Sequence, residues 1–260
     1  MKHKKSLGQN FLYDQNILNN IVNAGEVSED DIILEIGPGS GNLTEKILLK
    51  KPKKLIVVEK DGELSKRLQN KFKNNIEVIN KDILECFNDF KFNRPIKVFG
   101  NLPYNVSTKI LISFIKTKNF YESYKKFVFV FQKEVADRIV ANENSKNYGR
   151  ISVFTAWKTE RLKILDISPE CFYPKPKVWS SLISLSPKPK IEILKKAKNL
   201  EHITNTFFHN RRKMIKKPMK LLFEDYENIA KKINLDLDLR PQNLPKEKYF
   251  QICKIYENLS

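Results

Sequence analysis

The chain has 260 residues, of which 41% are hydrophobic, and its 48 basic against 30 acidic side chains give a formal net charge of +18. This length fits one ordinary domain with a small second one, and the hydrophobic content argues against a disordered chain. Single cysteines without a CxxC pair argue against a bound metal or a disulfide framework, and the lack of a membrane-length apolar run or a signal peptide indicates a cytoplasmic protein with no membrane association.

Short apolar runs alternate with amphipathic stretches through most of the chain. Asp14 is placed to cap a helix that ends near Gly25. The expected strands cover residues 32–36, 55–58, 76–79, 96–99, 127–131, 162–167 and 179–186. The expected helices between them cover residues 43–51, 62–73, 108–118 and 132–142. Strands separated by helices predict an α/β fold with a largely parallel sheet covered on both faces.

Pro187-Lys188-Pro189 ends this alternation, and the rest of the chain has helical patterns over residues 199–210, 211–224, 225–234 and 246–258. We expect Pro218 to kink or interrupt the second of these helices, because proline lacks a backbone N–H. The sequence therefore predicts two domains, residues 1–187 and residues 188–260.

Positive charge is concentrated in residues 188–220, which hold eleven Lys or Arg side chains against Glu192 and Glu201. Such a segment is typical of a surface that contacts nucleic-acid phosphates. A general lysine bias in the genome would also produce a basic chain, so charge alone leaves RNA binding open.

A glycine-rich turn, Gly37-Pro38-Gly39-Ser40-Gly41, joins the expected strand 32–36 to the expected helix 43–51. Turns of this kind let the backbone approach a ligand at the carboxyl end of a doubly wound sheet. Glu59 ends the next strand, where it could accept both ribose hydroxyls, and Asp82 ends a third, where it could accept an adenine amine. These charges favour a sulfonium cofactor without phosphates, although solvated strand-end acids remain the alternative.

The tetrapeptide Asn101-Leu102-Pro103-Tyr104 follows the expected strand 96–99. An exocyclic aromatic amine is a poor nucleophile, because its lone pair is delocalised into the ring. An Asn carbonyl and a nearby backbone carbonyl could accept both amine hydrogens and localise that lone pair. Tyr104 could stack on an unpaired base. The plain alternative is an ordinary proline turn with a packing tyrosine.

Motifs along the whole chain resemble those of the ribosomal RNA adenine dimethyltransferases, and most closely the bacterial small-subunit branch that sets kasugamycin susceptibility. They are Ser6–Leu12 (SLGQNFL), Gly100–Thr108 (GNLPYNVST), Gln132–Arg138 (QKEVADR), Tyr148–Val153 (YGRISV), Cys171–Val178 (CFYPKPKV) and Phe207–Lys213 (FFHNRRK). The resemblance implies a class I methyltransferase sheet of seven strands, the last antiparallel, followed by a small helical RNA-binding domain.

The resemblance also implies site residues. S-adenosylmethionine would be bound by Asn10, Leu12, Gly37, Glu59, Asp82 and Asn101. The catalytic residues would be Asn101, Leu102, Pro103 and Tyr104, with Phe172 packed against the target adenine. RNA contacts are expected from Arg211, Arg212 and Lys213. The implied reaction dimethylates two adjacent adenines near the 3′ end of small-subunit ribosomal RNA. We expect the substrate to be an immature ribosomal particle and the protein to be a monomer.

Four positions depart from the family pattern: Trp179 stands where Asp is usual, Lys217-Pro218 replaces Asn-Ser, and Gln242 stands where Glu is common. Three rival functions remain. They are dimethylation of large-subunit RNA, a non-catalytic assembly factor that retained the fold, and methylation of a small molecule, which would leave the basic segment without a role.

Overall fold

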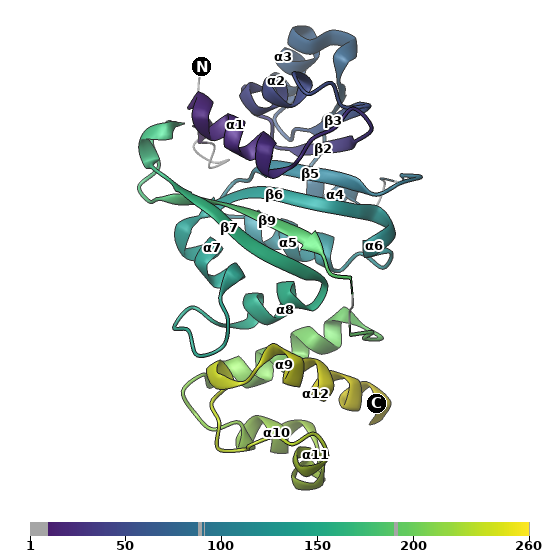
Figure 1. The fold of residues 1–260 in the computed structure, drawn as a ribbon, viewed down its shortest axis with the longest axis vertical. Helices are drawn as coiled ribbons and strands as arrows, with labels where there is room; N and C mark the ends of the chain where they lie inside the picture. Colours follow the sequence, from purple (N-terminus) through teal and green to yellow (C-terminus); the bar gives the residue numbers. More distant parts are fainter. Residues whose placement is uncertain (1–9, 88–89, 91, 190–191, 260) are drawn as a thin grey trace. The chain divides into compact units, whose positions relative to one another are not determined.

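The computed structural model describes residues 10–87, 90, 92–189 and 192–259 (Figure 1). Its contacts divide the chain into unit 1, Met1–Ala136 with Arg161–Pro187, and unit 2, Asp137–Glu160 with Lys188–Ser260. The predicted boundary at residue 187 falls on one edge of this division. Residues 137–160 group with the C-terminal part by contact, so a functional division at residue 187 alone stays a prediction.

Unit 1 is built on a seven-stranded sheet of order β4-β3-β2-β5-β6-β9-β7 (Figure 1). Its central strands are parallel: β2 pairs with β3 and with β5, and β5 pairs with β6. The last strand, β9, runs antiparallel to β6. This confirms the predicted α/β sheet and its antiparallel last strand. The strands are β2 (Ile32–Ile36), β3 (Lys54–Val58), β4 (Glu77–Ile79), β5 (Ile96–Asn101), β6 (Tyr124–Gln132), β7 (Thr159–Ile167) and β9 (Ser180–Pro187).

Helices cover both faces of this sheet, and β6 shows why. Val128 and Val130 lie in a core with α1, α2 and α3, whereas Phe127 on the opposite face contacts the rings of Phe114 and Phe120 from α5 and α6. The predicted N-cap is confirmed, since the Asp14 carboxylate accepts from the Ile17 N–H at 2.9 Å. The helices are α1 (Gln15–Ala24), α2 (Asn42–Leu48), α3 (Gly62–Phe72), α4 (Ile83–Cys86), α5 (Ser107–Ile115), α6 (Phe120–Ser123) and α7 (Lys133–Val140).

A separate two-stranded sheet joins the two ends of unit 1. Strand β1 (Phe11–Leu12) pairs antiparallel with β8 (Phe172–Tyr173), so that Leu12 lies opposite Phe172. Two-residue strands carry no periodic signal, and the sequence did not predict them. The pairing brings Phe11 and Leu12, the end of the N-terminal motif, beside the motif that contains Phe172.

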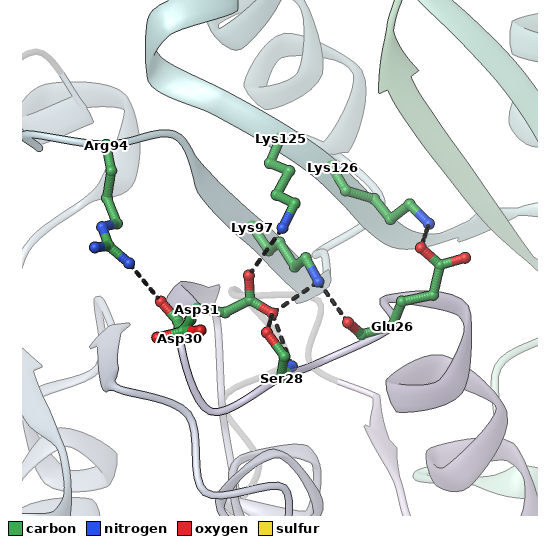
Figure 2. Close-up of polar contacts among 8 residues, drawn as sticks. All are labelled: Glu26, Ser28, Asp30, Asp31, Arg94, Lys97, Lys125 and Lys126. Atoms are coloured by element: carbon green, nitrogen blue, oxygen red, sulfur yellow. Dashed lines mark hydrogen bonds and ion pairs between the residues drawn. The ribbon is translucent and has the colours of Figure 1, made fainter.

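An ion-pair cluster closes the amino-terminal edge of the sheet (Figure 2). Lys97, on β5, is 3% exposed and donates to the Asp31 carboxylate at 2.7 Å and to the Glu26 carbonyl at 2.5 Å. Asp31 also accepts from the backbone N–H and hydroxyl of Ser28. Burial raises the pKa of Asp31, but the hydrogen bonds from Lys97 and Ser28 lower it by more. The net pKa therefore lies below its usual value. The charge of the buried Lys97 is therefore balanced by the Asp31 carboxylate.

Unit 2 contains the remaining helices: α8 (Arg150–Lys158), α9 (Ala197–His209), α10 (Lys216–Leu222), α11 (Tyr226–Lys232) and α12 (Lys246–Leu259). The predicted helix 211–224 with a kink at Pro218 is wrong. The Ile215 and Lys216 N–H groups donate instead to the carbonyls of Leu239 and Leu237, and α10 begins only at Lys216. Pro218 is thus in the first helical turn, where a missing N–H costs little.

Helix α8 was not predicted. Ser152–Lys158 are all buried, and a helix that is covered all round shows no amphipathic period. Along the described part of the chain, no helix combines the length and apolarity needed to cross a membrane.

Candidate active site

The carboxyl ends of β2, β3 and β5 meet around a cavity of about 650 Å³, its open mouth included. Eight of the predicted site residues line it: Asn10, Leu12, Gly37, Glu59, Asn101, Leu102, Pro103 and Tyr104. The structure adds Phe11, Leu18, Glu35, Pro38, Gly39, Ser40, Asn42 and Leu43.

The glycine turn forms the floor of this cavity. Gly37, Gly39 and Gly41 have φ angles of +65°, +57° and +80°, which side-chain-bearing residues rarely adopt. A Cβ on Gly39 would lie 2.6 Å from the Phe11 ring, whereas one on Gly37 would meet no atom closer than 3.9 Å. The turn is therefore packed beneath β1 at Gly39 but leaves space at Gly37.

Two buried carboxyl groups lie in the cavity wall. Glu59 is 4% exposed and accepts from the Gly39 N–H at 3.1 Å and from the Asp61 N–H at 2.9 Å. Burial raises its pKa in spite of these bonds. Glu35 is 1% exposed and accepts from the Thr44 hydroxyl, and burial raises its pKa to about 8. Sequence reasoning missed Glu35, although an acid within an apolar strand, two residues before Gly37, was the available signal.

The donor set of this cavity suits S-adenosylmethionine. Its described lining includes Glu35 and Glu59 but no Lys or Arg. A phosphate would face two acids without a counter-charge, whereas a cationic, phosphate-free ligand would offset the cost of ionising them. A carboxylate has about four acceptor sites, so Glu59 can still accept a ribose hydroxyl beside its backbone hydrogen bonds.

Asp82 lies in an adjoining cavity of about 720 Å³ that shares Gly37, Glu59 and Pro103 with the first. Its carboxylate caps α4 by accepting from the Leu84 N–H at 2.9 Å, and it pairs with Lys60 at 2.9 Å. Burial raises the pKa of Asp82, but Lys60 and the Leu84 N–H lower it more, so that its net pKa is below normal. Asp82 is therefore an ionised hydrogen-bond acceptor in a cavity that Glu59 also lines.

Asn101 is held in one orientation at the cavity wall. Its Nδ2 donates to the Asn10 carbonyl at 2.7 Å. Because a carbonyl can only accept, the other amide atom, Oδ1, must be the one left to accept from a ligand. Within the same corner, the Pro103 carbonyl accepts from Val106 and Ser107 at the start of α5.

The two predicted aromatic contacts differ in their exposure. Tyr104 is half-buried, lines the cavity and shares a 2.6 Å hydrogen bond between its hydroxyl and that of Ser180. Phe172 is 2% exposed, lies in the core cluster and is absent from the described lining of the cavity. A contact between Phe172 and a base would therefore need its side chain or β8 to move. Its neighbour Tyr173 is 63% exposed.

The predicted RNA-binding residues belong to unit 2 and differ from one another. Arg212 and Lys213 are exposed. Arg211 is partly buried and donates to the Gln242 side chain at 3.1 Å and to the carbonyls of Ser145 and Lys146. It therefore joins three segments of unit 2, a structural role that the basic run did not indicate.

Comparison with known proteins gives one consistent family. A family model described as "Ribosomal RNA adenine dimethylase" matches residues 1–258. The chain is 50% identical to "Ribosomal RNA small subunit methyltransferase A" of Pelagibacter ubique, over 100% of this chain and 98% of that one. It is 41% identical to the protein of the same name from Ehrlichia chaffeensis, over 96% and 95%.

Solved structures share the fold. A dimethyladenosine transferase from Plasmodium falciparum aligns with a TM-score of 0.78 at 24% identity, covering 95% of this chain and 98% of that one. The 23S rRNA methyltransferase ErmE aligns with a TM-score of 0.72 at 22% identity, covering 95% and 100%. Likeness at this identity is evidence for the fold, and it confirms the predicted class I methyltransferase architecture.

Proposed function

The chain belongs to the ribosomal RNA adenine dimethylase family, and from that premise we propose that it adds two methyl groups to the amine of each of two adjacent adenines near the 3′ end of small-subunit ribosomal RNA. The coarser activity follows directly from its relatives: it is an S-adenosylmethionine-dependent methyltransferase of small-subunit ribosomal RNA. We further propose that it acts in the cytoplasm, as a monomer, on an immature ribosomal particle.

The observation that carries the proposed chemistry is the orientation of Asn101. With Nδ2 committed to the Asn10 carbonyl, Oδ1 accepts one hydrogen of the adenine amine. The Leu102 carbonyl is the natural second acceptor, because those of Pro103 and Tyr104 already accept bonds from the start of α5. Two acceptors draw the amine nitrogen towards tetrahedral geometry and localise its lone pair.

The cofactor, when bound, supplies the electrophilic sulfonium methyl group. Glu59 would hold its ribose hydroxyls, Asp82 its adenine amine, and the backbone at Gly37 would pass close beside it. Asn10, just before β1, and Leu12, within it, line the cavity, and the Leu12 carbonyl accepts from the Asn42 side chain at 2.8 Å. The protein's main contribution is then positioning the amine and the methyl group in line.

Tyr104 supports the target base by stacking, worth about 1–3 kcal/mol per base. Its bond to Ser180 fixes the ring from the side of β9. Phe172 is the second proposed aromatic contact, formed once β8 or its side chain shifts. Arg212 and Lys213 contribute phosphate contacts from unit 2.

The test is to incubate the protein with unmethylated small ribosomal subunits and methyl-labelled cofactor, and to map the modified bases. The expected result is dimethylation of two neighbouring adenines near the 3′ end, with large subunits unlabelled in parallel. Label in large subunits alone would identify the rival substrate. Absence of label in both, despite measurable cofactor binding, would indicate a non-catalytic assembly factor.

A further inference from the structure

Trp179 is a half-exposed indole at the edge of the sheet that carries the site. It is 51% exposed and immediately precedes Ser180, the first residue of β9. Ser180 lies opposite Gln132 at the end of β6 and shares the hydrogen bond with Tyr104. The residue that follows Trp179 in the chain thus contacts Tyr104 of the catalytic corner directly.

The backbone around Trp179 is firmly held. Its carbonyl accepts from the Lys133 N–H at 2.9 Å, at the start of α7. Two residues further on, the Ser181 hydroxyl donates to Asp166 at 2.6 Å. The indole is therefore presented from an anchored segment, which reduces the conformational entropy lost when a ligand binds to it.

Exposure of this ring is hard to explain by packing. A tryptophan that serves the core buries most of its surface, as Trp157 does at 5% exposure. Trp179 leaves about half of its surface to solvent, and the residues that precede it in the chain add the exposed side chains of Tyr173, Lys177 and Lys175, the last of which pairs with Glu170. Aromatic faces interleaved with positive charge are typical of surfaces that bind single-stranded nucleic acid.

The position relative to Asn101 indicates which nucleotide would be contacted. Asn101 lies opposite Val130, and Val130 lies opposite Leu182. With about 4.8 Å between strands and about 3.3 Å per residue along β9, the backbone of Trp179 lies roughly 14 Å from that of Asn101. This separation suits a nucleotide that flanks the target adenine rather than the target itself.

We propose that Trp179 stacks on the base of an unpaired nucleotide flanking the target adenine, and so helps to position the RNA. The inference rests on the proposed function, because it takes single-stranded RNA as the substrate. It makes Trp179 a positioning residue that acts on RNA affinity and leaves the cofactor site unchanged.

Fluorescence provides a direct test, because the chain holds only two tryptophans and the other is buried. Oligoadenylate is titrated into the wild type and into Trp179→Phe at low salt. We expect quenching in the wild type and its loss in Trp179→Phe, since Trp157 is shielded. No quenching at any oligoadenylate concentration, or equal quenching in both proteins, would overturn the proposal.

Kinetics on unmethylated small subunits provide the second arm. Trp179→Ala should raise KM about tenfold with little change in kcat or cofactor affinity, and Trp179→Phe should recover most of the loss because it restores a ring. Leu162→Ala, which removes another exposed apolar side chain from unit 1, is the matched control and should behave as the wild type.

Different results would refute the proposed function and the proposed stacking of Trp179. If the wild type does not methylate small subunits, the proposed function fails, whereas the oligoadenylate titration still tests the stacking. If the wild type is active and Trp179→Ala has an unchanged KM, only the stacking is refuted. A raised KM without oligoadenylate quenching would also refute it, since it would point to a protein contact on the particle.

Discussion

At the residue scale, one hydrogen bond decides what the catalytic corner can do. The Asn101 side chain is oriented by the Asn10 carbonyl, from a segment ninety-one positions earlier in the chain. An isolated NLPY motif would leave the amide free to rotate. The corner therefore depends on β1, which is itself held by pairing with β8.

Replacing Asn101 with Ala should lower kcat by about 100-fold or more, the scale expected when one preorganised polar contact to a reacting group is lost. Cofactor affinity should fall much less, because Glu59, Asp82 and the glycine turn remain. Single-turnover methyl transfer and calorimetric cofactor binding separate the two effects. Near-normal turnover in this variant would refute the role of the amide.

The buried acid Glu35 predicts an unusual pH dependence of stability. Its folded pKa of about 8 lies above its ordinary value of 4.5. Between these values the native state keeps a proton that the unfolded state releases, so the unfolding free energy falls as pH rises. Glu35→Gln removes this titration. It should reduce the loss of unfolding free energy between the two pKa values by an amount on the order of a few kcal/mol.

Urea unfolding of the cofactor-free protein between pH 5 and pH 8.5 measures this slope. Glu45→Gln makes the same chemical change at a side chain that is 59% exposed and should leave the slope as in the wild type. A Glu35→Gln variant with the wild-type slope would mean that Glu35 is ionised in the folded protein. Some slope will remain in any case, because burial also raises the pKa of Glu59.

At the scale of elements, the amino-terminal edge of the sheet depends on the buried Lys97–Asp31 pair (Figure 2). Removing one partner of a buried pair typically costs about 3–5 kcal/mol, because the other charge is left uncompensated. We expect Asp31→Asn to lower the unfolding free energy on this scale. Its catalytic rate well below the melting temperature should stay near normal, since the cavity lies at the opposite, carboxyl edge.

The matched control is the more exposed pair in the same cluster. Glu26 is 75% exposed and pairs with Lys126 at 2.7 Å, so Glu26→Gln should cost about 1 kcal/mol or less. Equal losses in the two variants, measured by denaturant unfolding, would contradict the distinction between the buried and the exposed pair.

At this scale, the sequence predicts those features whose signals lie within a few neighbouring residues. The strands of the sheet and the Asp14 cap were predictable because apolar runs and capping side chains are local. The pairing of β1 with β8, the tie from Arg211 to residues 145–146, and the start of α10 depend on partners distant in sequence. Local periodicity carries no information about such partners.

The site shows the same division. The positions of Glu59, Asp82 and Asn101 were predictable because each lies at or shortly after the carboxyl end of a strand, and the carboxyl ends of parallel strands meet at one edge. Glu35 was missed although an acid within an apolar strand is an unusual signal, whereas the burial of Phe172 had no local signal because it depends on how β8 packs against the core.

At the scale of the whole molecule, a net charge of +18 should make RNA binding strongly dependent on salt. Removing Arg212 and Lys213 together should reduce the slope of log K against log salt by about 1.4, at about 0.7 per charge for single-stranded RNA. Filter binding over a salt series measures the slope. Cofactor affinity should not change.

Two controls separate charge from structure. Lys66→Ala with Arg67→Ala removes the same two residue types from exposed positions on α3 and should preserve the slope. Arg211→Ala should chiefly lower the melting temperature, because its guanidinium joins segments of unit 2. If the Arg212 and Lys213 variant keeps the full slope, those side chains are only a solvated face.

The most direct test is a crystal structure of the protein bound to S-adenosylhomocysteine and adenosine. We predict that the ribose hydroxyls lie within hydrogen-bonding distance of Glu59, and the adenosine amine within hydrogen-bonding distance of Asn101 Oδ1 and the Leu102 carbonyl. A product bound outside this cavity, or an Asn101 side chain turned away from the adenosine, would contradict it.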